Sequence, residues 1–219
     1  MARRTDGPIP PRDGSPDLPR RLEETSELQT RTEVFAARIT GLTGHIDASH
    51  AHLTECVVEG ATIDRWDLTG AALTDVRIDD LRATEVVARD TRWRSVEISG
   101  GRIGTLDLMR AEFDGIIVRG ARIDYLSLPA AQLADVQFID CRIGTMDLPQ
   151  ATATRVAFTG SQVDEVDTRG LRAQHTDLRG LEALSFTDPT ALRGATLSPQ
   201  QAETHAVALA VALGISVAD

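Results

Sequence analysis

Uncharged residues recur at every fifth position over most of the chain, and this pattern predicts its architecture. The frame begins at Leu53, runs without an insertion or deletion through Leu148, and continues to Ala183. A second uncharged series stands two positions before the first, as at Cys56 and Ala61. Residues two apart point to the same side of an extended segment, so each five-residue unit is expected to place one pair of side chains inward.

The five-residue period excludes the common helical patterns, because it fits neither the 3.6-residue period of an α-helix nor a heptad. The units also differ in a cycle of four, so that "IGTLDL" at 103–108 returns as "IGTMDL" at 143–148. Glycine or aspartate often closes the cycle, as at Gly60 and Asp80, and both residues tolerate tight turns. Four units are therefore predicted to form one coil of a β-solenoid.

The units "GATID", "GAALT", "RAEFD" and "GARID" resemble those of the bacterial pentapeptide-repeat family. The resemblance covers about residues 41–188 and implies a right-handed quadrilateral β-helix. In "LRA" at 81–83 and 171–173 and "LEA" at 181–183 the large and small members of the inward pair are exchanged, which conserves volume. Some members of the family are similar to duplex DNA in shape and negative charge and act on type II topoisomerases, so the resemblance implies DNA mimicry as one candidate role.

The ends of the chain depart from the repeat. Residues 1–31 are rich in proline and arginine and are expected to be a disordered tail. Residues 32–40 could form an initial strand or N-terminal cap whose Val34 and Phe35 cover the first coil. An open coil end exposes strand edges, so a cap is needed there as well as at the C-terminal end.

A helix is predicted over about residues 199–213, within the C-terminal segment 189–219. Ser198 is its expected N-cap, with Pro199 at the first helical position and Gly214 after the last. One apolar stripe follows the helix: Ala202, Ala206, Leu209, Ala210 and Leu213. The stripe predicts either a lid over the last coil, which we favour, or the interface of a homodimer.

Charge and hydropathy narrow the range of partners. The net charge is −10 and all 23 basic residues are arginine, so direct binding to nucleic acid or to an anionic membrane is disfavoured. The longest apolar run, 206–217, is shorter than the roughly 20 residues that span a bilayer. The N-terminal arginines lack a following apolar run of the secretory type, and a cytoplasmic location is expected.

Candidate chemistry is sparse. His45, His50, His52 and Cys56 could suggest a metal site, but the coil frame turns Cys56 inward and the histidines outward. Cys56 and Cys141 lie more than four coils apart, too far for a disulfide, and both are expected to be free buried thiols. Ser161, His175 and Asp177 are near one another in sequence without a catalytic pattern. No metal, cofactor or enzymatic activity is therefore expected.

Two columns of charge are the main functional candidates. Arg82, Arg102, Arg122 and Arg142 stand one position before inward residues of successive coils, and the acidic column comprises Asp47, Asp67, Asp107, Asp147 and Asp167. Mutual neutralisation of the two columns is the preferred interpretation, with recognition of a protein partner as the alternative. The leading hypothesis is a scaffold without catalytic activity that binds another protein, and the second is a DNA mimic that modulates a type II topoisomerase.

Overall fold

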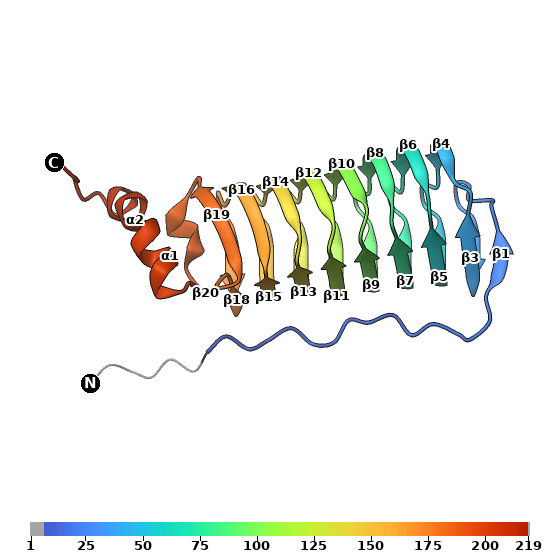
Figure 1. The fold of residues 1–219 in the computed structure, drawn as a ribbon, viewed down its shortest axis with the longest axis horizontal. Helices are drawn as coiled ribbons and strands as arrows, with labels where there is room; N and C mark the ends of the chain where they lie inside the picture. The colour runs from blue at the N-terminus through green and yellow to red at the C-terminus, as the bar shows by residue number, and fades with distance from the viewer. Residues whose placement is uncertain (1–6, 219) are drawn as a thin grey trace.

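Two parallel sheets, wound from one continuous chain, form a rod in the computed structural model, which describes residues 7–218 (Figure 1). Strands alternate between the sheets along the repeat region. The 12-stranded sheet contains β1 (Glu23–Thr25), β2 (Glu33–Phe35), β3 (Ala37–Thr40), β5 (His52–Glu59), β7 (Ala72–Asp79), β9 (Arg92–Ser99), β11 (Glu112–Arg119), β13 (Gln132–Ile139), β15 (Thr152–Thr159), β17 (Arg172–Gln174), β18 (Thr176–Asp177) and β20 (Ala195–Thr196). The 8-stranded sheet contains β4 (Thr43–Asp47), β6 (Thr62–Asp67), β8 (Arg82–Val87), β10 (Arg102–Asp107), β12 (Arg122–Ser127), β14 (Arg142–Asp147), β16 (Ser161–Asp167) and β19 (Leu181–Phe186).

The strand register confirms the predicted coil. From β5 to β16, each strand pairs in parallel with a strand 20 positions later, so that Leu53 lies beside Leu73 and Ile103 beside Ile123. Identical positions of successive coils therefore stack in columns about 4.8 Å apart. The predicted fold class, an all-β solenoid of the quadrilateral β-helix type with helix at its C-terminal end, is confirmed.

The interior is built from the two uncharged series. The side chains of Leu53, Ile103, Leu108 and Trp66 are all at most 2% exposed. Aromatic rings meet along the rod axis, with 5.0 Å between the centroids of Phe138 and Phe158. The frame weakens toward the C-terminal end, where Ala173 and Ala183 are only half-buried.

Corners of the coil use left-handed backbone. One such column runs along the 12-stranded sheet, within its long strands and, at His175, between β17 and β18: Glu55, Asp75, Ser95, Gly115, Asp135, Arg155 and His175, all with positive φ. We call these seven residues the left-handed column. Gly101 also has a positive φ of 86°, and a Cβ there would lie 2.3 Å from the Leu81 carbonyl oxygen. A side chain is excluded from that position by both conformation and space.

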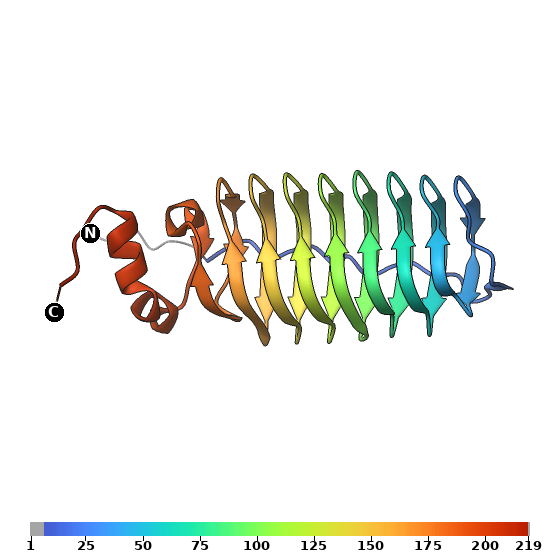
Figure 2. The same cartoon turned by 90° about the horizontal axis from the view of Figure 1, so that it is seen from above.

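The N-terminal region differs from the expected disordered tail of residues 1–31. Residues 1–6 lie outside the described part of the chain, but the segment from Gly7 to Leu22 runs extended beside the rod for most of its length (Figures 1 and 2). It leads into strand β1, which pairs with β3, and Leu28 beyond it is 6% exposed. Composition alone suggested disorder because proline-rich segments cannot form a core of their own, whereas here the rod supplies the surface.

Residues 32–40 contain two short strands, β2 and β3, that both pair with β5. Val34 packs against the core, as the sequence suggested. Phe35 does not cover the first coil, because its side chain is 65% exposed.

Two short helices replace the single predicted helix. α1 (Pro199–Thr204) begins with the predicted cap, in which Ser198 and Gln201 bond each other's backbone amides, and α2 (Ala206–Ala212) follows after a break at His205. A 3-10 helix, η1 (Pro189–Leu192), precedes both and lies against α2. No helix within residues 7–218 is long and apolar enough to cross a membrane.

The apolar stripe does not form a continuous lid. Leu209 and Ala210 are half-buried, whereas Ala202, Ala206 and Leu213 are exposed. The break at His205 turns the two helices relative to each other, so one stripe cannot follow both.

Other residues anchor the helices to the last coil. The Gln201 side-chain amide donates to the carbonyl oxygens of Leu178 and Leu181 at 2.7 and 2.6 Å. His205, which is buried, stacks edge-on against Phe186 at 5.0 Å. The cap is therefore fastened by polar and aromatic contacts.

Candidate interaction surfaces

Four arginines form an exposed column on the 8-stranded sheet. Arg82, Arg102, Arg122 and Arg142 stand side by side in β8, β10, β12 and β14. Like charges about 4.8 Å apart repel one another unless an anion lies among them. The column therefore favours an acidic neighbour.

Asp124 is the acidic group that the column contacts. It accepts a hydrogen bond from Arg102 at 3.0 Å and another from Arg122 at 3.5 Å, and these contacts lower the pKa of its carboxyl. Gly104 and Gly144 have no side chains, so shallow grooves open beside the arginines. Asp124 contacts only two of the four guanidinium groups. The other N–H donors of the arginine column therefore face solvent.

The predicted mutual neutralisation of the two charged columns is not what the structure shows. The arginines stand at the first residue of short strands and the aspartates at the last, and β10 and β14 contain one of each, as Arg102 and Asp107 show in β10. Five residues of extended chain separate them by about 16 Å. The two columns therefore lie at opposite edges of the 8-stranded sheet.

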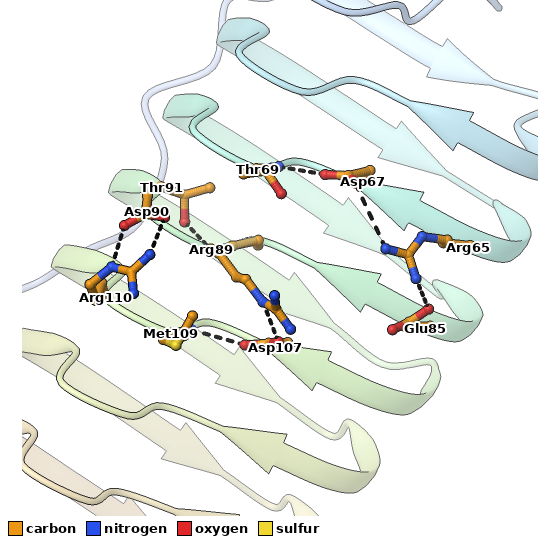
Figure 3. A network of polar contacts seen from close by, with 11 residues as sticks. Arg65, Asp67, Thr69, Glu85, Arg89, Asp90, Thr91, Asp107, Met109 and Arg110 are labelled. Carbon is orange, nitrogen blue, oxygen red and sulfur yellow. Dashed lines mark hydrogen bonds and ion pairs between the residues drawn. The ribbon is translucent and has the colours of Figure 1, made fainter.

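Most of the aspartate column caps corners of the coil. Asp67 accepts a hydrogen bond from the Thr69 amide at 2.9 Å, and Asp107 accepts one from the Met109 amide at 3.1 Å (Figure 3). The carboxylates of Asp47 and Asp167 accept from backbone amides two positions on in the same way. These side chains stabilise turns, which explains their recurrence every 20 residues without a partner.

Individual members of the aspartate column differ. Asp167 is 7% exposed and bonded to Arg169, which corrects the expectation that it faces outward. Asp147 instead accepts a hydrogen bond from Tyr125, and this bond raises the pKa of Tyr125 to about 12. The column is therefore not a uniform acidic stripe.

Ion pairs between coils neutralise further charge on this side of the rod (Figure 3). Arg89 donates to Asp107 at 2.6 Å, and Arg110 holds Asp90 through two hydrogen bonds of 2.6 and 2.7 Å. The Arg110 contacts lower the pKa of the Asp90 carboxyl. A net charge of −10 therefore overstates the free negative surface that this side presents.

A buried carboxylate lies on the opposite sheet. The side chain of Asp135, in the left-handed column, is 1% exposed and receives two hydrogen bonds from Arg155, at 2.6 and 2.7 Å. Arg12 of the N-terminal segment adds its Nε at 2.7 Å and its backbone amide at 2.9 Å. These donors hold the pKa of Asp135 well below its usual range, with Arg155 the larger cause.

Sequence reasoning missed the Asp135 site because Arg12 lies in a segment expected to be disordered. A signal was present nonetheless. Half-buried or buried residues recur every third position at Pro8, Pro11 and Gly14, and again at Pro16, Pro19 and Leu22. Three residues per turn is the period of polyproline II, so the proline spacing predicts one face that can dock.

The residues considered for catalysis do not converge. Ser161 is buried, where its hydroxyl accepts a hydrogen bond from the Cys141 amide at 3.1 Å. Asp177 is bonded to Arg179 at 2.8 Å, and the Nδ1 of His175 accepts from the Ile9 amide at 3.4 Å. Each side chain has a structural partner of its own.

The residues considered for metal binding are also dispersed. His45, His50 and His52 are exposed, while Cys56 is buried and its thiol contacts the Thr54 carbonyl oxygen. Burial raises the pKa of both the Cys56 and Cys141 thiols, which are free. Within residues 7–218 no cluster of three or more metal-binding side chains occurs.

Matches to this chain occur among solved structures. No protein-family model and no curated protein sequence matches the chain. Among solved structures, it is similar to a trypsin-treated variant of QnrB1, a plasmid-mediated fluoroquinolone resistance protein, with 18% identity, a TM-score of 0.38, and coverage of 90% of this chain and 97% of that one.

A second similar structure is that of HetL, a pentapeptide-repeat protein involved in the regulation of heterocyst differentiation in the cyanobacterium Nostoc sp. strain PCC 7120. The identity is 15% and the TM-score 0.37, over 79% of this chain and 87% of HetL.

Proposed function

We propose that the protein is a scaffold of the pentapeptide-repeat type, without catalytic activity, that binds another protein through an outer face of the rod. The observation that supports this proposal most is the exposed arginine column of the 8-stranded sheet. Its spacing is fixed by the backbone ladder, so little backbone entropy is lost on binding. A partner with regularly spaced carboxylates would fit it.

The test is affinity capture from the native cell followed by mass spectrometry, with the intact chain as bait. A variant with Arg82, Arg102, Arg122 and Arg142 all changed to Gln should lose the partner while keeping its thermal midpoint. A matched control changes Arg20 and Arg21, outside this face, to Gln and should retain it. A turnover activity that persists through repurification and is abolished by one point mutation would contradict the scaffold proposal.

Modulation of a type II topoisomerase by DNA mimicry is the second candidate. The net charge of −10 on a narrow rod favours it. We propose to test it with a supercoiling assay on bacterial gyrase, using the triple variant of Asp67, Asp107 and Asp147 to Asn. Asn retains the oxygen that caps the turns at positions 67 and 107 and the one that accepts from Tyr125 at position 147, but it removes the charge, so a weakened effect would report charge. No effect of the unaltered protein at any concentration would eliminate this candidate.

The two free, buried thiols of Cys56 and Cys141 support a proposed location in a reducing compartment such as the cytoplasm. Fractionation of the native cell, with immunodetection of the protein, would test that proposal.

A further inference from the structure

The N-terminal segment contacts four residues of the left-handed column. The Ile9 amide donates to His175, Arg12 bonds Asp135, and the Asp17 amide donates to Asp75 at 3.0 Å. Gly14 lies directly on Gly115. His175, Asp135, Gly115 and Asp75 all belong to the left-handed column, so the segment follows this column across five coil spacings.

The spacing of these contacts matches the rise of an extended proline-rich chain. Three residues separate Ile9 from Arg12 while their contacts lie two coils apart, and three separate Gly14 from Asp17, again for two coils. Polyproline II rises about 9.3 Å in three residues, and two coils span about 9.6 Å. The period of the segment and the period of the rod are therefore commensurate.

Two features make the contact selective. Gly14 is buried, and a Cβ on it would lie 2.4 Å from the carbonyl carbon of Gly115, so only glycine fits at position 14, while a Cβ on Gly115 would lie 3.1 Å from the Gly14 Cα. Arg12 reaches the buried Asp135 and also Asp114 at 2.9 Å. A segment that docks here needs an extended backbone, an arginine, and a glycine two positions later.

We propose that the left-handed column, with Asp114 beside it, is a binding track for extended proline-rich peptide segments that carry this arginine and glycine, and that residues 7–22 occupy it within the same chain. The partner is a protein that presents such a segment, and it binds by displacing the N-terminal one. This inference rests on the proposed scaffold function and names a different face from the arginine column. Because the N-terminal segment is covalently attached, its high effective concentration makes it a strong competitor.

The experiment uses the full chain and a labelled synthetic peptide with the sequence of residues 7–22. In the full-chain variant Gly14→Leu the new side chain meets the Gly115 backbone, so the attached segment should leave the track. Fluorescence anisotropy should then show the peptide binding to Gly14→Leu at least tenfold more tightly than to the unaltered chain. A peptide with Arg12→Ala should bind Gly14→Leu at least tenfold more weakly than the original peptide.

Release is measured independently by trypsin cleavage after Arg20 and Arg21, sites that all three chains keep, and it should be faster in Gly14→Leu. Gly14 lies outside every strand, so circular dichroism should be unchanged, and Arg12→Glu provides a second variant with the same expected release. Equal cleavage of all three chains, or no peptide binding to a variant whose segment is released, would overturn the proposal. A dimer that becomes a monomer on Gly14→Leu would identify a second copy as the occupant and also overturn it.

The peptide experiment can fail independently of the scaffold proposal. Loss of the captured partner in the arginine-column variant, without peptide binding to Gly14→Leu, would retain the scaffold and reject the track. Peptide binding without any effect of the arginine-column variant would retain the track and reject the arginine column as the face that binds the partner.

Discussion

Arg12 and Asp135 are 123 positions apart in the chain, and the Arg12 Nε donates to the Asp135 carboxylate at 2.7 Å. Arg12 is largely exposed, with 66% of its side-chain surface accessible, while Asp135 is 1% exposed. Asp135 also accepts two hydrogen bonds from Arg155, a residue of the rod itself. The contact can therefore open without leaving a buried carboxylate unpaired.

Arg12→Ala should loosen the N-terminal segment and leave the rod folded. Limited trypsin digestion followed by mass spectrometry should show faster cleavage at Arg20 and Arg21, because segments held against a surface resist proteolysis. The thermal midpoint should change little, since Arg155 still neutralises Asp135. Arg142→Ala, on the other sheet, is the control, and equal cleavage rates in the two variants would contradict this prediction.

Asp135→Asn should make the free energy of unfolding depend less on pH in the acid range. The pKa of Asp135 is depressed in the folded protein, so its charged form contributes stability that is fully present above about pH 4 to 5 and lost as pH falls toward the folded pKa. Asn cannot titrate, so the variant lacks this contribution, on the order of 1–3 kcal/mol at neutral pH. Urea unfolding of both chains from pH 7 to 2.5 measures it, and parallel profiles would refute the assignment.

The repeat interior could be predicted from sequence because each coil repeats one spatial constraint. A narrow rod admits only uncharged side chains at the two inward positions, so Leu53, Leu108 and Leu148 carry the same signal. Every residue of the coil also has the same neighbours one period away, which removes the usual ambiguity of long-range pairing.

The surface could not be predicted in the same way. An outward aspartate such as Asp107 follows the same 20-residue period whether it caps a turn or contacts a partner, and the hydrogen bond to Met109 decides between the two. The contact of Arg12 with Asp135 depends on tertiary proximity that no local pattern encodes. The break at His205 likewise follows from its packing against Phe186 and not from helix propensity.

Leu108→Asp should be severely destabilising, whereas Asp107→Asn should be mild. Leu108 is 2% exposed, so aspartate there places an unpaired charge in the interior and should cost more than about 4 kcal/mol. Asn at position 107 keeps an oxygen for the Met109 amide and loses only the partly exposed ion pair with Arg89, worth about 1 kcal/mol or less. Thermal denaturation compares the two, and equal midpoints would disprove the inward frame.

Gly101→Ala should destabilise the rod much more than Gly120→Ala. Both glycines have positive φ, so alanine incurs conformational strain of about 1–2 kcal/mol at either position. At Gly120 a Cβ would meet no atom within 4 Å, but at Gly101 it would lie 2.3 Å from the Leu81 carbonyl oxygen. Gly120→Ala is thus a matched control that reports conformational strain alone. Urea midpoints that differ by less than their error would show that the backbone at Gly101 yields freely.

Variants on two opposite faces of α2 should show whether the C-terminal helices cap the last coil or form a dimer interface. Leu209 is half-buried toward η1, whereas Val207 and Val211 are 59% and 60% exposed. If α2 only caps the last coil, sedimentation should give a monomer, Val211→Glu should leave mass and stability unchanged, and Leu209→Glu should lower the thermal midpoint. If the exposed face forms a homodimer, the unaltered protein should sediment as a dimer and Val211→Glu should yield soluble monomers, since symmetry would bring the two charges close together. We expect the monomer, because Gln201 and His205 already fasten this end to the last coil, and a reproducible dimer mass that Val211→Glu abolishes would reject that expectation.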